Sequence, residues 1–177
     1  IKIAYFLKFK KRLNLKNPQT LNEKIQWLKL YDRKPLYNLL VDKYLVKDYI
    51  SDQIGAEYVI PTLGKWYNFD DINFDNFPEQ FVLKCNHDSG GIVICTDKKN
   101  FDKKKARKVI EKHLKRNYFW HGREWAYKDI KPVIIVEEYI KSSDEDDLKD
   151  YKFFCFNGKV KCFKVDCDRF TNHKAYY

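Results

Sequence analysis

Hydrophobic positions in the first third of the chain recur with the spacing of amphipathic helices. Thr20 and Glu23 match a capping box, in which each side chain accepts a hydrogen bond from the backbone N–H of the other residue. This box predicts a helix over residues 21–31. A second amphipathic helix is predicted over residues 41–53, with Gly55 as its C-terminal stop.

Shorter hydrophobic runs with the lengths of strands follow. The pattern predicts a strand over residues 57–60, a loop-rich stretch with aromatic anchors over residues 63–78, two strands flanking a polar loop over residues 81–95, a basic helix over residues 102–118 and a strand over residues 132–136. Since residues 132–136 are continuously apolar, that strand is expected to be central and covered on both faces. Two last strands, over residues 151–156 and 159–165, flank Asn157-Gly158, a strong signal for a type I′ turn.

The order of these elements predicts an α+β fold with two antiparallel units rather than an alternating parallel sheet. The acidic stretch at residues 142–147 is the natural boundary between two lobes. We therefore divide the chain into a helical segment over residues 1–55, a first lobe with a glycine-rich loop over residues 56–140, and the start of a second lobe over residues 141–177. The sequence begins without Met and ends abruptly, so we expect it to be a piece of a longer protein.

The composition indicates which classes of molecule the protein can bind. The formal net charge of +10 favours polyanions such as nucleotides, anionic glycans or a negative membrane face. Nucleic acid fits the charge as well, but no known motif supports it, so we expect no nucleic-acid partner. Five cysteines without a CxxC pair, four of them in strand-like runs, suit buried free thiols in a reducing cytoplasm. No apolar run approaches membrane-spanning length, so we expect a cytoplasmic protein, with peripheral association at the inner membrane face as a further interpretation.

One lysine stands inside a predicted strand. Lys84 lies between Leu83 and Cys85, and burial of a lysine in a sheet is costly unless an anion meets its charge. The phosphate of a nucleotide would be such an anion. A lysine facing water from an edge strand is the alternative interpretation.

The polar loop that follows ends in two glycines, which allow backbone N–H groups to approach a phosphate closely. The loop is neither a Walker A motif nor a dinucleotide fingerprint. We interpret Ser89, Gly90 and Gly91 as a mobile flap over a terminal phosphate, with an ordinary hairpin turn as the alternative. His87 is a candidate phosphate ligand, and a loop histidine without function is an equal alternative.

Four residues end the continuous apolar strand: Glu137, Glu138, Tyr139 and Ile140. We interpret them as a hinge between lobes, where backbone groups pair with the edge of adenine and apolar side chains stack on the base. Solvated acids at the end of a strand are the alternative.

The last hairpin opens with Asp150 and Lys152, which are candidates for contacts with ribose hydroxyls and with phosphates or substrate. A surface ion pair is the alternative. Asp166 and Asp168 stand in a polar cluster after the last strand, where metal binding is a candidate role and a polar loop the favoured one. Lys43 lies opposite the apolar side of its predicted helix, so the pattern alone predicts that it faces solvent.

The succession of a lysine-bearing hairpin with a glycine loop, a basic helix, a long strand, an acidic hinge and a second hairpin resembles the ATP-grasp fold. More specifically, the chain from about Leu15 onward resembles the TupA-like ATP-grasp family, found with bacterial surface-polysaccharide and teichuronopeptide synthesis. The matching stretches are residues 21–28, 42–44, 81–91, 122–125, 150–159 and 168–174. Asp88 departs from the family pattern, which usually has glycine there, and it places negative charge near the expected phosphates.

The resemblance implies an ATP-dependent carboxylate–amine ligase in which two α+β lobes clamp ATP, and a carboxylate is activated as an acylphosphate and attacked by an amine. It implies that Lys43 and Lys84 contact the phosphates and that Lys152 and Arg169 stabilise charge during transfer. It further implies Mg²⁺ as a cofactor and an amino acid or a uronic-acid glycan as substrate. The family's acidic metal ligands lie in later segments that this sequence does not contain, so residues 1–177 offer no metal site beyond the weak candidates Asp166 and Asp168.

Rival interpretations come from other classes of protein. A glycosyltransferase, or a nucleotide-binding accessory protein of a polysaccharide cluster, is the first alternative. Glycosyltransferases of that kind typically need a DxD-like metal pair at the end of a strand, and Asp166-Cys167-Asp168 has that spelling. Preference for a sugar nucleotide over ATP would favour this alternative.

Overall fold

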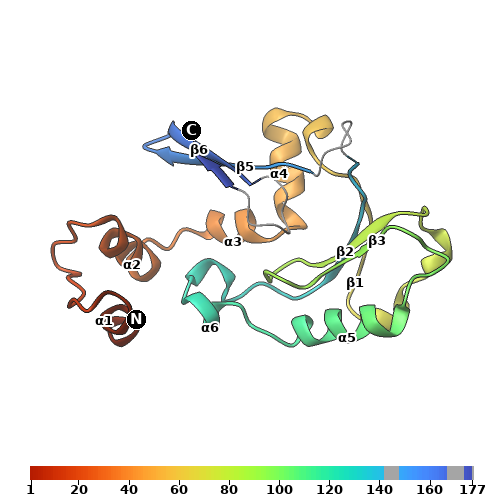
Figure 1. Ribbon diagram of the computed structural model, residues 1–177, viewed down its shortest axis with the longest axis horizontal. Coiled ribbons are helices and arrows are strands. Elements are labelled where there is room, and N and C mark those ends of the chain that lie inside the picture. Colours follow the sequence, from red (N-terminus) through yellow and green to blue (C-terminus); the bar gives the residue numbers. More distant parts are fainter. Residues whose placement is uncertain (142–147, 167–173, 177) are drawn as a thin grey trace. The chain divides into compact units, whose positions relative to one another are not determined.

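The computed structural model describes residues 1–141, 148–166 and, for the backbone only, 174–176. The chain divides into two compact units, residues 1–139 and residues 140–177, and each is described by itself (Figure 1). The structure confirms a mixed α+β protein with antiparallel sheets. Among the described residues, no helix is both long enough and apolar enough to cross a membrane.

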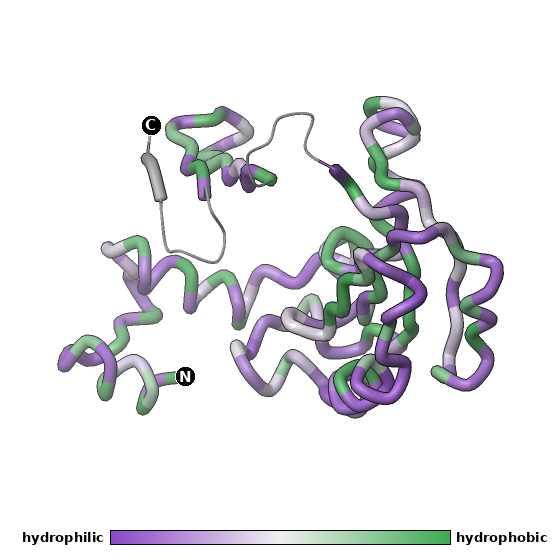
Figure 2. The backbone as a smooth tube through the Cα atoms, turned by 45° about the vertical axis from the view of Figure 1, so that its right-hand side comes forward, coloured by the Kyte–Doolittle hydropathy of each residue, from purple (hydrophilic) through white to green (hydrophobic). Residues whose placement is uncertain are grey.

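The first unit opens with helices. Their bounds are α1 Lys2–Phe9, α2 Leu21–Tyr31, α3 Pro35–Val41 and α4 Leu45–Ile54. The predicted capping box is confirmed: the Glu23 N–H donates to Thr20 Oγ1 over 3.3 Å, and the Thr20 N–H donates to Glu23 Oε2 over 3.0 Å. The apolar side of α2 stays exposed, and hydrophobic and hydrophilic positions intermingle along these helices (Figure 2).

The predicted helix over residues 41–53 is wrong at its start, because the chain turns between α3 and α4. The buried Asp42 explains the break: its Oδ1 accepts from the backbone N–H groups of Tyr44 at 2.8 Å and Leu45 at 3.2 Å. A short acidic side chain that bonds backbone N–H groups two and three residues ahead starts a new helix. Gly55 ends α4 as predicted, with φ +113° and its N–H bonded to the Ser51 carbonyl.

The predicted strand over residues 57–60 is also wrong. Residues Ala56–Tyr58 form a 3₁₀ helix, η1, and the first strand is β1, Thr62–Trp66, which lies in the stretch expected to be loop-rich. β1 pairs antiparallel with β4, with a bulge between Thr62 and Gly64. A segment with strand propensity forms a strand only where a partner strand can pair with it, and here β4 pairs with residues 62–66.

Four strands form the sheet of the first unit in the order β1-β4-β2-β3, where β2 is Phe81–Cys85, β3 is Ile92–Cys95 and β4 is Ile134–Glu138. The central position predicted for β4 is confirmed, since Ile134, Ile135 and Val136 are fully buried. Both faces of this strand are therefore covered.

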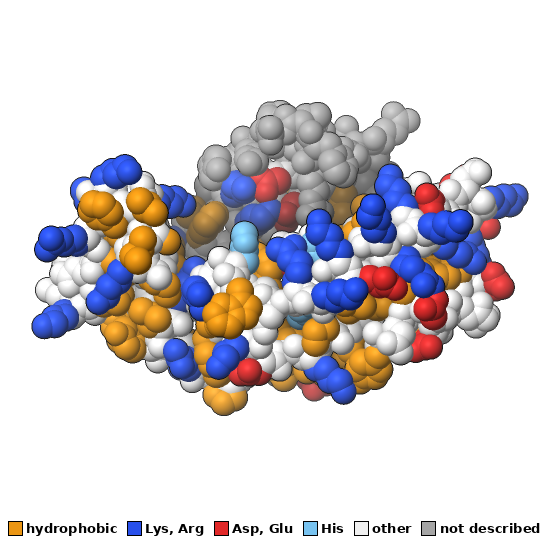
Figure 3. Space-filling view, turned by 90° about the horizontal axis from the view of Figure 1, so that it is seen from below, with side chains coloured by type: hydrophobic (Ala, Val, Ile, Leu, Met, Phe, Trp, Pro, Cys, Tyr) orange, Lys and Arg blue, Asp and Glu red, His pale blue; other side chains and the backbone are white. Residues whose placement is uncertain are grey.

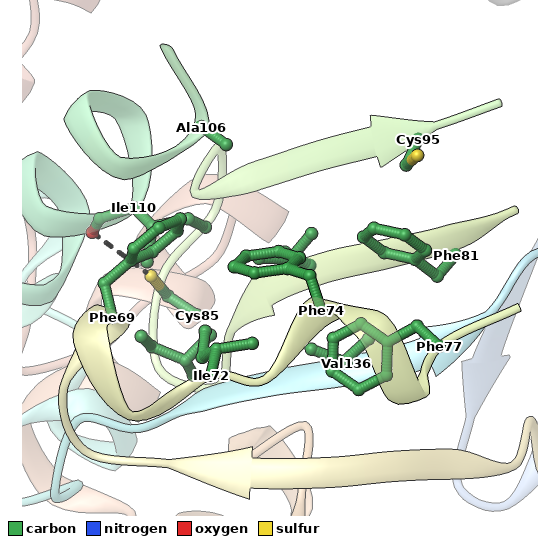
Figure 4. Packing of buried hydrophobic residues seen from close by; sticks show 12 residues of the cluster. Phe69, Ile72, Phe74, Phe77, Phe81, Cys85, Cys95, Ala106, Ile110 and Val136 are labelled. Carbon is green, nitrogen blue, oxygen red and sulfur yellow. Dashed lines mark hydrogen bonds between the residues drawn. The ribbon is translucent and has the colours of Figure 1, made fainter. Parts of the chain in front are cut away.

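The core lies on the face of the sheet that carries Phe81, Leu83 and Cys85. Helix α5, Lys103–Leu114, packs there against β2 and β3, and Cys85 Sγ lies 3.7 Å from the Ile110 carbonyl oxygen (Figure 4). The segment expected to carry aromatic anchors folds into the 3₁₀ helices η2, Phe69–Asp71, and η3, Phe74–Asn76. The anchors Phe69, Phe74 and Phe77 are buried, as expected. Two further short helices follow α5: α6, Phe119–Gly122, and η4, Trp125–Tyr127.

The second unit is a sheet in the order β5-β6-β7, with β5 Asp150–Phe156, β6 Lys159–Asp166 and β7 Lys174–Tyr176. The predicted turn is confirmed, because both central residues have positive φ, 50° at Asn157 and 73° at Gly158, as a type I′ turn requires. The acidic stretch at residues 142–147 lies outside the described residues.

The cysteines divide into two groups. Cys85 and Cys95 are buried free thiols as expected, whereas Cys155 and Cys162 are exposed, which corrects the expectation of buried thiols in all strand-like runs. Cys155 and Cys162 lie in the two-stranded hairpin, where β5 is exposed along most of its length. Cys167 lies outside the described residues.

This division predicts selective modification. Burial raises the pKa of Cys85 to about 12 and also raises the pKa of Cys95, so neither thiol is ionised at neutral pH. The thiolate is the reactive form. Iodoacetamide at pH 7.5 is therefore expected to label Cys155 and Cys162 at least about tenfold faster than Cys85, as measured by mass spectrometry of peptides from the native protein. Equal labelling of Cys85 in the native and urea-unfolded protein would contradict the packing described here.

Candidate functional site

Lys84 lies on the sheet face opposite the core, and it meets a carboxylate. In the register of the sheet Lys84 pairs with Ile135 and Val82 pairs with Glu137, so Lys84 and Glu137 are diagonal neighbours on one face. Lys84 Nζ forms an ion pair and hydrogen bond with Glu137 Oε2. The anion expected for a strand lysine is thus present within the chain, and the Glu137 side chain is only 4% exposed.

A second lysine contacts the other oxygen of this carboxylate. Lys47, from α4, places its Nζ 2.7 Å from Glu137 Oε1. The same Nζ donates to the Ile60 carbonyl and to Thr62 Oγ1, each over 2.7 Å. The sequence interpretation missed Lys47, because no local pattern marks its contact with Glu137, which lies far along the chain.

Lys43 does not face open solvent, which corrects the expectation from the helical pattern. It lies in the turn between α3 and α4 and is partly buried, and its Nζ donates to the backbone carbonyls of Asn86 and Asp88. Burial lowers the pKa of Lys43 below its usual value, and the neighbouring charge of Lys84 lowers it further, while Asp88 opposes the shift. Two cations therefore share a partly dehydrated environment.

Asn86 holds this region together. Its Nδ2 donates to Asp42 Oδ2 over 2.9 Å and to the Lys131 carbonyl over 3.1 Å, and its Oδ1 accepts from the Val133 N–H over 2.9 Å. The Asn86 carbonyl accepts from the Lys43 N–H over 3.1 Å. One buried amide therefore links the end of β2, the turn before α4 and the approach to β4.

The loop after Asn86 is fixed at its beginning by a buried carboxylate. Asp88 forms an ion pair with His113 Nδ1, lies 3.7 Å from Arg116 Nη1, and accepts from the Ser89 N–H over 2.6 Å. The negative charge of Asp88 is thus matched by His113, in the last turn of α5, and by Arg116, which follows the end of that helix. Neither His113 nor Arg116 was a candidate from the sequence, because no local pattern marks a contact between residues so far apart in the chain.

His87 is a second anchor of the loop. The side chain is 2% exposed, its Nε2 donates to the Arg116 carbonyl over 2.9 Å, and its Nδ1 lies 3.2 Å from Asn86 Oδ1. In this arrangement the ring packs inside the protein, and a role of His87 as a phosphate ligand remains a prediction.

The burial of His87 predicts a pH dependence of stability. Burial lowers the pKa of His87 below its usual value near 6.5. The unfolded chain therefore takes up a proton at a higher pH than the folded chain does. The free energy of unfolding has its full value above about pH 6.5 and decreases as the pH falls below that value. Urea denaturation at pH 7.5 and pH 5.5 should show a smaller fall for His87→Gln than for the unchanged protein. A His121→Gln control, at an exposed position, should retain the full fall.

The glycines of the loop have different surroundings. Gly90 is exposed and has φ +115°, a conformation that other residues rarely adopt. A Cβ on Gly91 would lie 2.8 Å from His113 Cβ and 2.9 Å from Cys85 Sγ, so this position must remain glycine for the hairpin to pack on α5. Ser89 and Gly90 form the exposed tip. Their role as a flap remains a prediction.

The four residues interpreted as a hinge, 137–140, differ in their burial. The Glu137 side chain is engaged by the two lysines, whereas Glu138, next in β4, is exposed and its N–H donates to the Pro61 carbonyl over 3.2 Å. Tyr139 is half-buried, and Ile140 is exposed. A contact of this segment with adenine remains a prediction.

In the second unit, Asp150 and Lys152 are brought together with Asp166. Lys152 Nζ forms an ion pair with Asp150 and lies 2.6 Å from Asp166 Oδ2, and Lys164 Nζ lies 2.7 Å from Asp166 Oδ1. Hydrogen bonds from Lys152 and Lys164 lower the pKa of Asp166 to about 2. The charges of two carboxylates and two ammonium groups thus neutralise one another on one face of the β5–β6 pair. Cys167, Asp168 and Arg169 lie outside the described residues.

The cations of the first unit exceed its carboxylates where they meet. Lys47 and Lys84 share Glu137 as their counter-ion, and Lys43, which feels the charge of Lys84, donates to backbone carbonyls. The nearby carboxylates of Asp88 and Asp42 are already engaged by His113 and Asn86. Lys and Arg side chains are spread over the face seen in Figure 3. A polyanion such as a chain of phosphates would relieve the repulsion between Lys43 and Lys84, so the residues present fit that kind of ligand.

Comparison with known proteins identifies the family of this chain. Searches of curated protein sequences and of solved structures gave no significant match. A family model described as TupA-like ATPgrasp matches residues 23–177, which include the lysine-bearing hairpin, the glycine loop and both sheets. Because this match covers most of the sequence, the chain belongs to the TupA-like ATP-grasp family.

Proposed function

We propose that this protein is an ATP-dependent carboxylate–amine ligase of bacterial cell-envelope polysaccharide biosynthesis. Family membership supports ATP binding and ligase chemistry. The observation that carries the proposal for this chain is the buried Glu137 carboxylate held between Lys84 and Lys47. It keeps two ammonium groups ordered on a sheet face next to a glycine loop.

Lys84 and Lys43 would bind and orient phosphates. ATP would transfer its terminal phosphoryl group to a carboxylate, which gives an acylphosphate and releases ADP. An amine would then displace inorganic phosphate, with loss of a proton, to form the amide. Lys84 would exchange its bond with Glu137 for one with a phosphate oxygen, while Lys47 would keep Glu137 neutralised. Lys43 would add a second positive charge from the neighbouring turn. Charge neutralisation by groups already ordered is a large part of such catalysis.

The remaining candidates complete the proposal. Ser89 and Gly90 would close over the terminal phosphate with their backbone N–H groups, and Gly91 would hold the base of that loop against α5. The backbone from Glu138 to Ile140 would meet adenine, and Asp150 would meet the ribose. Lys152 and Arg169 would stabilise charge during transfer.

Mg²⁺ is implied by the family, but the described residues do not provide a fitting site. Among them, no group of three or more His, Cys, Asp or Glu side chains is arranged to hold a metal ion. Asp166 is neutralised by two lysines, which leaves it poorly suited to a metal and weakens the glycosyltransferase alternative based on Asp166-Cys167-Asp168.

Calorimetry with the full-length protein tests the proposal. ATP should bind with a Kd below about 1 mM, and UDP-sugars should bind at least tenfold more weakly. ADP release should then require both a carboxylate and an amine, supplied as a panel of amino acids and uronic-acid glycans. Preference for a UDP-sugar, or ADP release that no amine or carboxylate changes, would overturn the proposal.

A further inference from the structure

The carboxylate of Asp88 is directed from the glycine loop toward the end of α5. Its side chain is 0% exposed, and His113 Nδ1 donates a hydrogen bond to its Oδ2. Arg116 Nη1 lies 3.7 Å from the same oxygen. A buried carboxylate is costly unless neighbouring groups compensate its charge, so His113 and Arg116 stabilise this orientation of Asp88.

Asp88 also lies between two groups that the proposed function assigns to phosphates. Its Oδ1 accepts from the Ser89 N–H over 2.6 Å, and its backbone carbonyl accepts from Lys43 Nζ. The charges of Asp88 and Lys43 interact, because burial lowers the pKa of Lys43 whereas the carboxylate of Asp88 raises it. The direction of the Asp88 side chain therefore affects the charge that a phosphate would meet at Lys43.

Lys43 has a limited number of hydrogen-bond donors. An ammonium group has three N–H bonds, and the backbone carbonyls of Asn86 and Asp88 accept from Lys43 Nζ. A phosphate that binds Lys43 would accept from the remaining N–H. If the Asp88 carboxylate turned away from α5 toward Lys43, it would compete with the phosphate for that donor.

His113 contacts the loop by packing as well as by its hydrogen bond. A Cβ on Gly90 would lie 3.3 Å from His113 Cε1, and the His113 side chain is only 13% exposed. The imidazole is therefore confined between α5 and the loop. This confinement keeps its Nδ1 next to the Asp88 carboxylate.

We infer that His113 is a positioning residue for ATP and that it acts through Asp88. Its hydrogen bond holds the Asp88 carboxylate against α5, so that Lys43 can bind a phosphate without competition from this acid. Arg116 adds a second positive charge next to the same carboxylate from a side chain that is 41% exposed. The inference rests on the proposed function, because it adds to the phosphate-binding lysines a residue that itself contacts no phosphate.

Calorimetry with ATP and the full-length protein, at constant ionic strength, tests the inference. His113→Leu removes the donor, and it should weaken ATP binding about fivefold or more, because the Asp88 carboxylate is then free to turn toward Lys43. Asp88→Asn/His113→Leu also removes the competing charge and should restore the affinity to within about twofold of the unchanged protein. His113→Asn, whose amide retains a donor near the position of Nδ1, should likewise bind ATP within about twofold.

The control is Lys112→Leu, which places the same apolar side chain at the neighbouring exposed position of α5 and should leave the affinity within about twofold. Circular dichroism melting identifies any variant that fails to fold. If His113→Leu does not fold, Arg116→Leu removes the other compensating charge at a more exposed position. It should weaken ATP binding about twofold to threefold, and adding Asp88→Asn should remove that loss.

The outcomes separate this inference from the proposed function. Equal ATP affinity in His113→Leu and the unchanged protein would overturn the inference and leave the proposed function intact. A loss that persists in Asp88→Asn/His113→Leu would overturn it as well, because His113 would then act by packing alone and not through the charge of Asp88. If the unchanged protein does not bind ATP, the proposed function is refuted and the role of His113 in ATP binding is refuted with it.

Discussion

Replacing Lys84 by alanine is expected to weaken ATP binding at least about tenfold, a loss of roughly 1.4 kcal/mol or more. The reason is that Lys84 is an ordered ammonium group whose partner in the free protein, Glu137, is also held by Lys47. Lys84 can therefore turn to a phosphate while Glu137 keeps a counter-ion. Calorimetry at constant ionic strength measures the loss.

A matched change separates binding from folding. Lys65→Ala removes a lysine of the edge strand β1, which β4 separates from β2, and it should leave ATP affinity within about twofold. Lys65 stacks on Tyr44, with its Nζ 4.2 Å from the ring centre. If Lys84→Ala and Lys65→Ala bind ATP equally well, Lys84 is not a phosphate ligand.

The Glu137→Gln change tests whether Glu137 and the phosphates of ATP compete for the same lysines. This change leaves two partly buried lysines without their shared carboxylate, so the free protein should lose stability. Phosphates would supply the missing negative charge in the bound state, and a ligand that binds the folded state raises the melting temperature according to its affinity. Saturating ATP should therefore raise the melting temperature more in Glu137→Gln than in the unchanged protein. An equal rise in both proteins would mean that Glu137 and the phosphates do not compete for the same lysines.

The sequence predicted that Lys84 would meet an anion, but it did not identify the carboxylate of Glu137 as that anion, and the reason is physical. A lysine within a strand signals a need for an anion whatever the fold, so composition and pattern were sufficient. The identity of that anion depends on the register between β2 and β4, which places Glu137 diagonal to Lys84. Glu137 is 53 positions away in the chain, and no local pattern encodes such a register.

Elements with local signals were predicted well. The capping box before α2 and the Asn157-Gly158 turn depend on bonds between residues within a few positions, and both are confirmed. The strand over residues 57–60 was wrong because strand pairing depends on contacts far along the chain. The unbroken helix over residues 41–53 was wrong because the bonds of Asp42 to the backbone of Tyr44 and Leu45, which start a new helix, were not recognised. β1 forms where β4 offers an edge, and the break before α4 is fixed by Asp42, whose other oxygen is held by Asn86.

Asn86→Ala is expected to lower the free energy of unfolding by about 3 kcal/mol. Asn86 is 1% exposed, and the change would leave the buried Asp42 carboxylate and the Val133 N–H without the amide that each now bonds. Buried polar groups that lose a partner cost about 1–3 kcal/mol each. Urea denaturation followed by circular dichroism measures the loss.

The control is Asn100→Ala. Asn100 is exposed and its amide donates to Asp97 over 2.7 Å, so its removal should cost less than about 1 kcal/mol. A similarly small loss in Asn86→Ala would show that the amide does not link these elements. Because the Asn86 amide also bonds Asp42, the residue before Lys43, the folded fraction of Asn86→Ala should bind ATP more weakly than the Asn100→Ala protein. The stability of the fold and the placement of a phosphate-binding lysine would then depend on the same buried side chain.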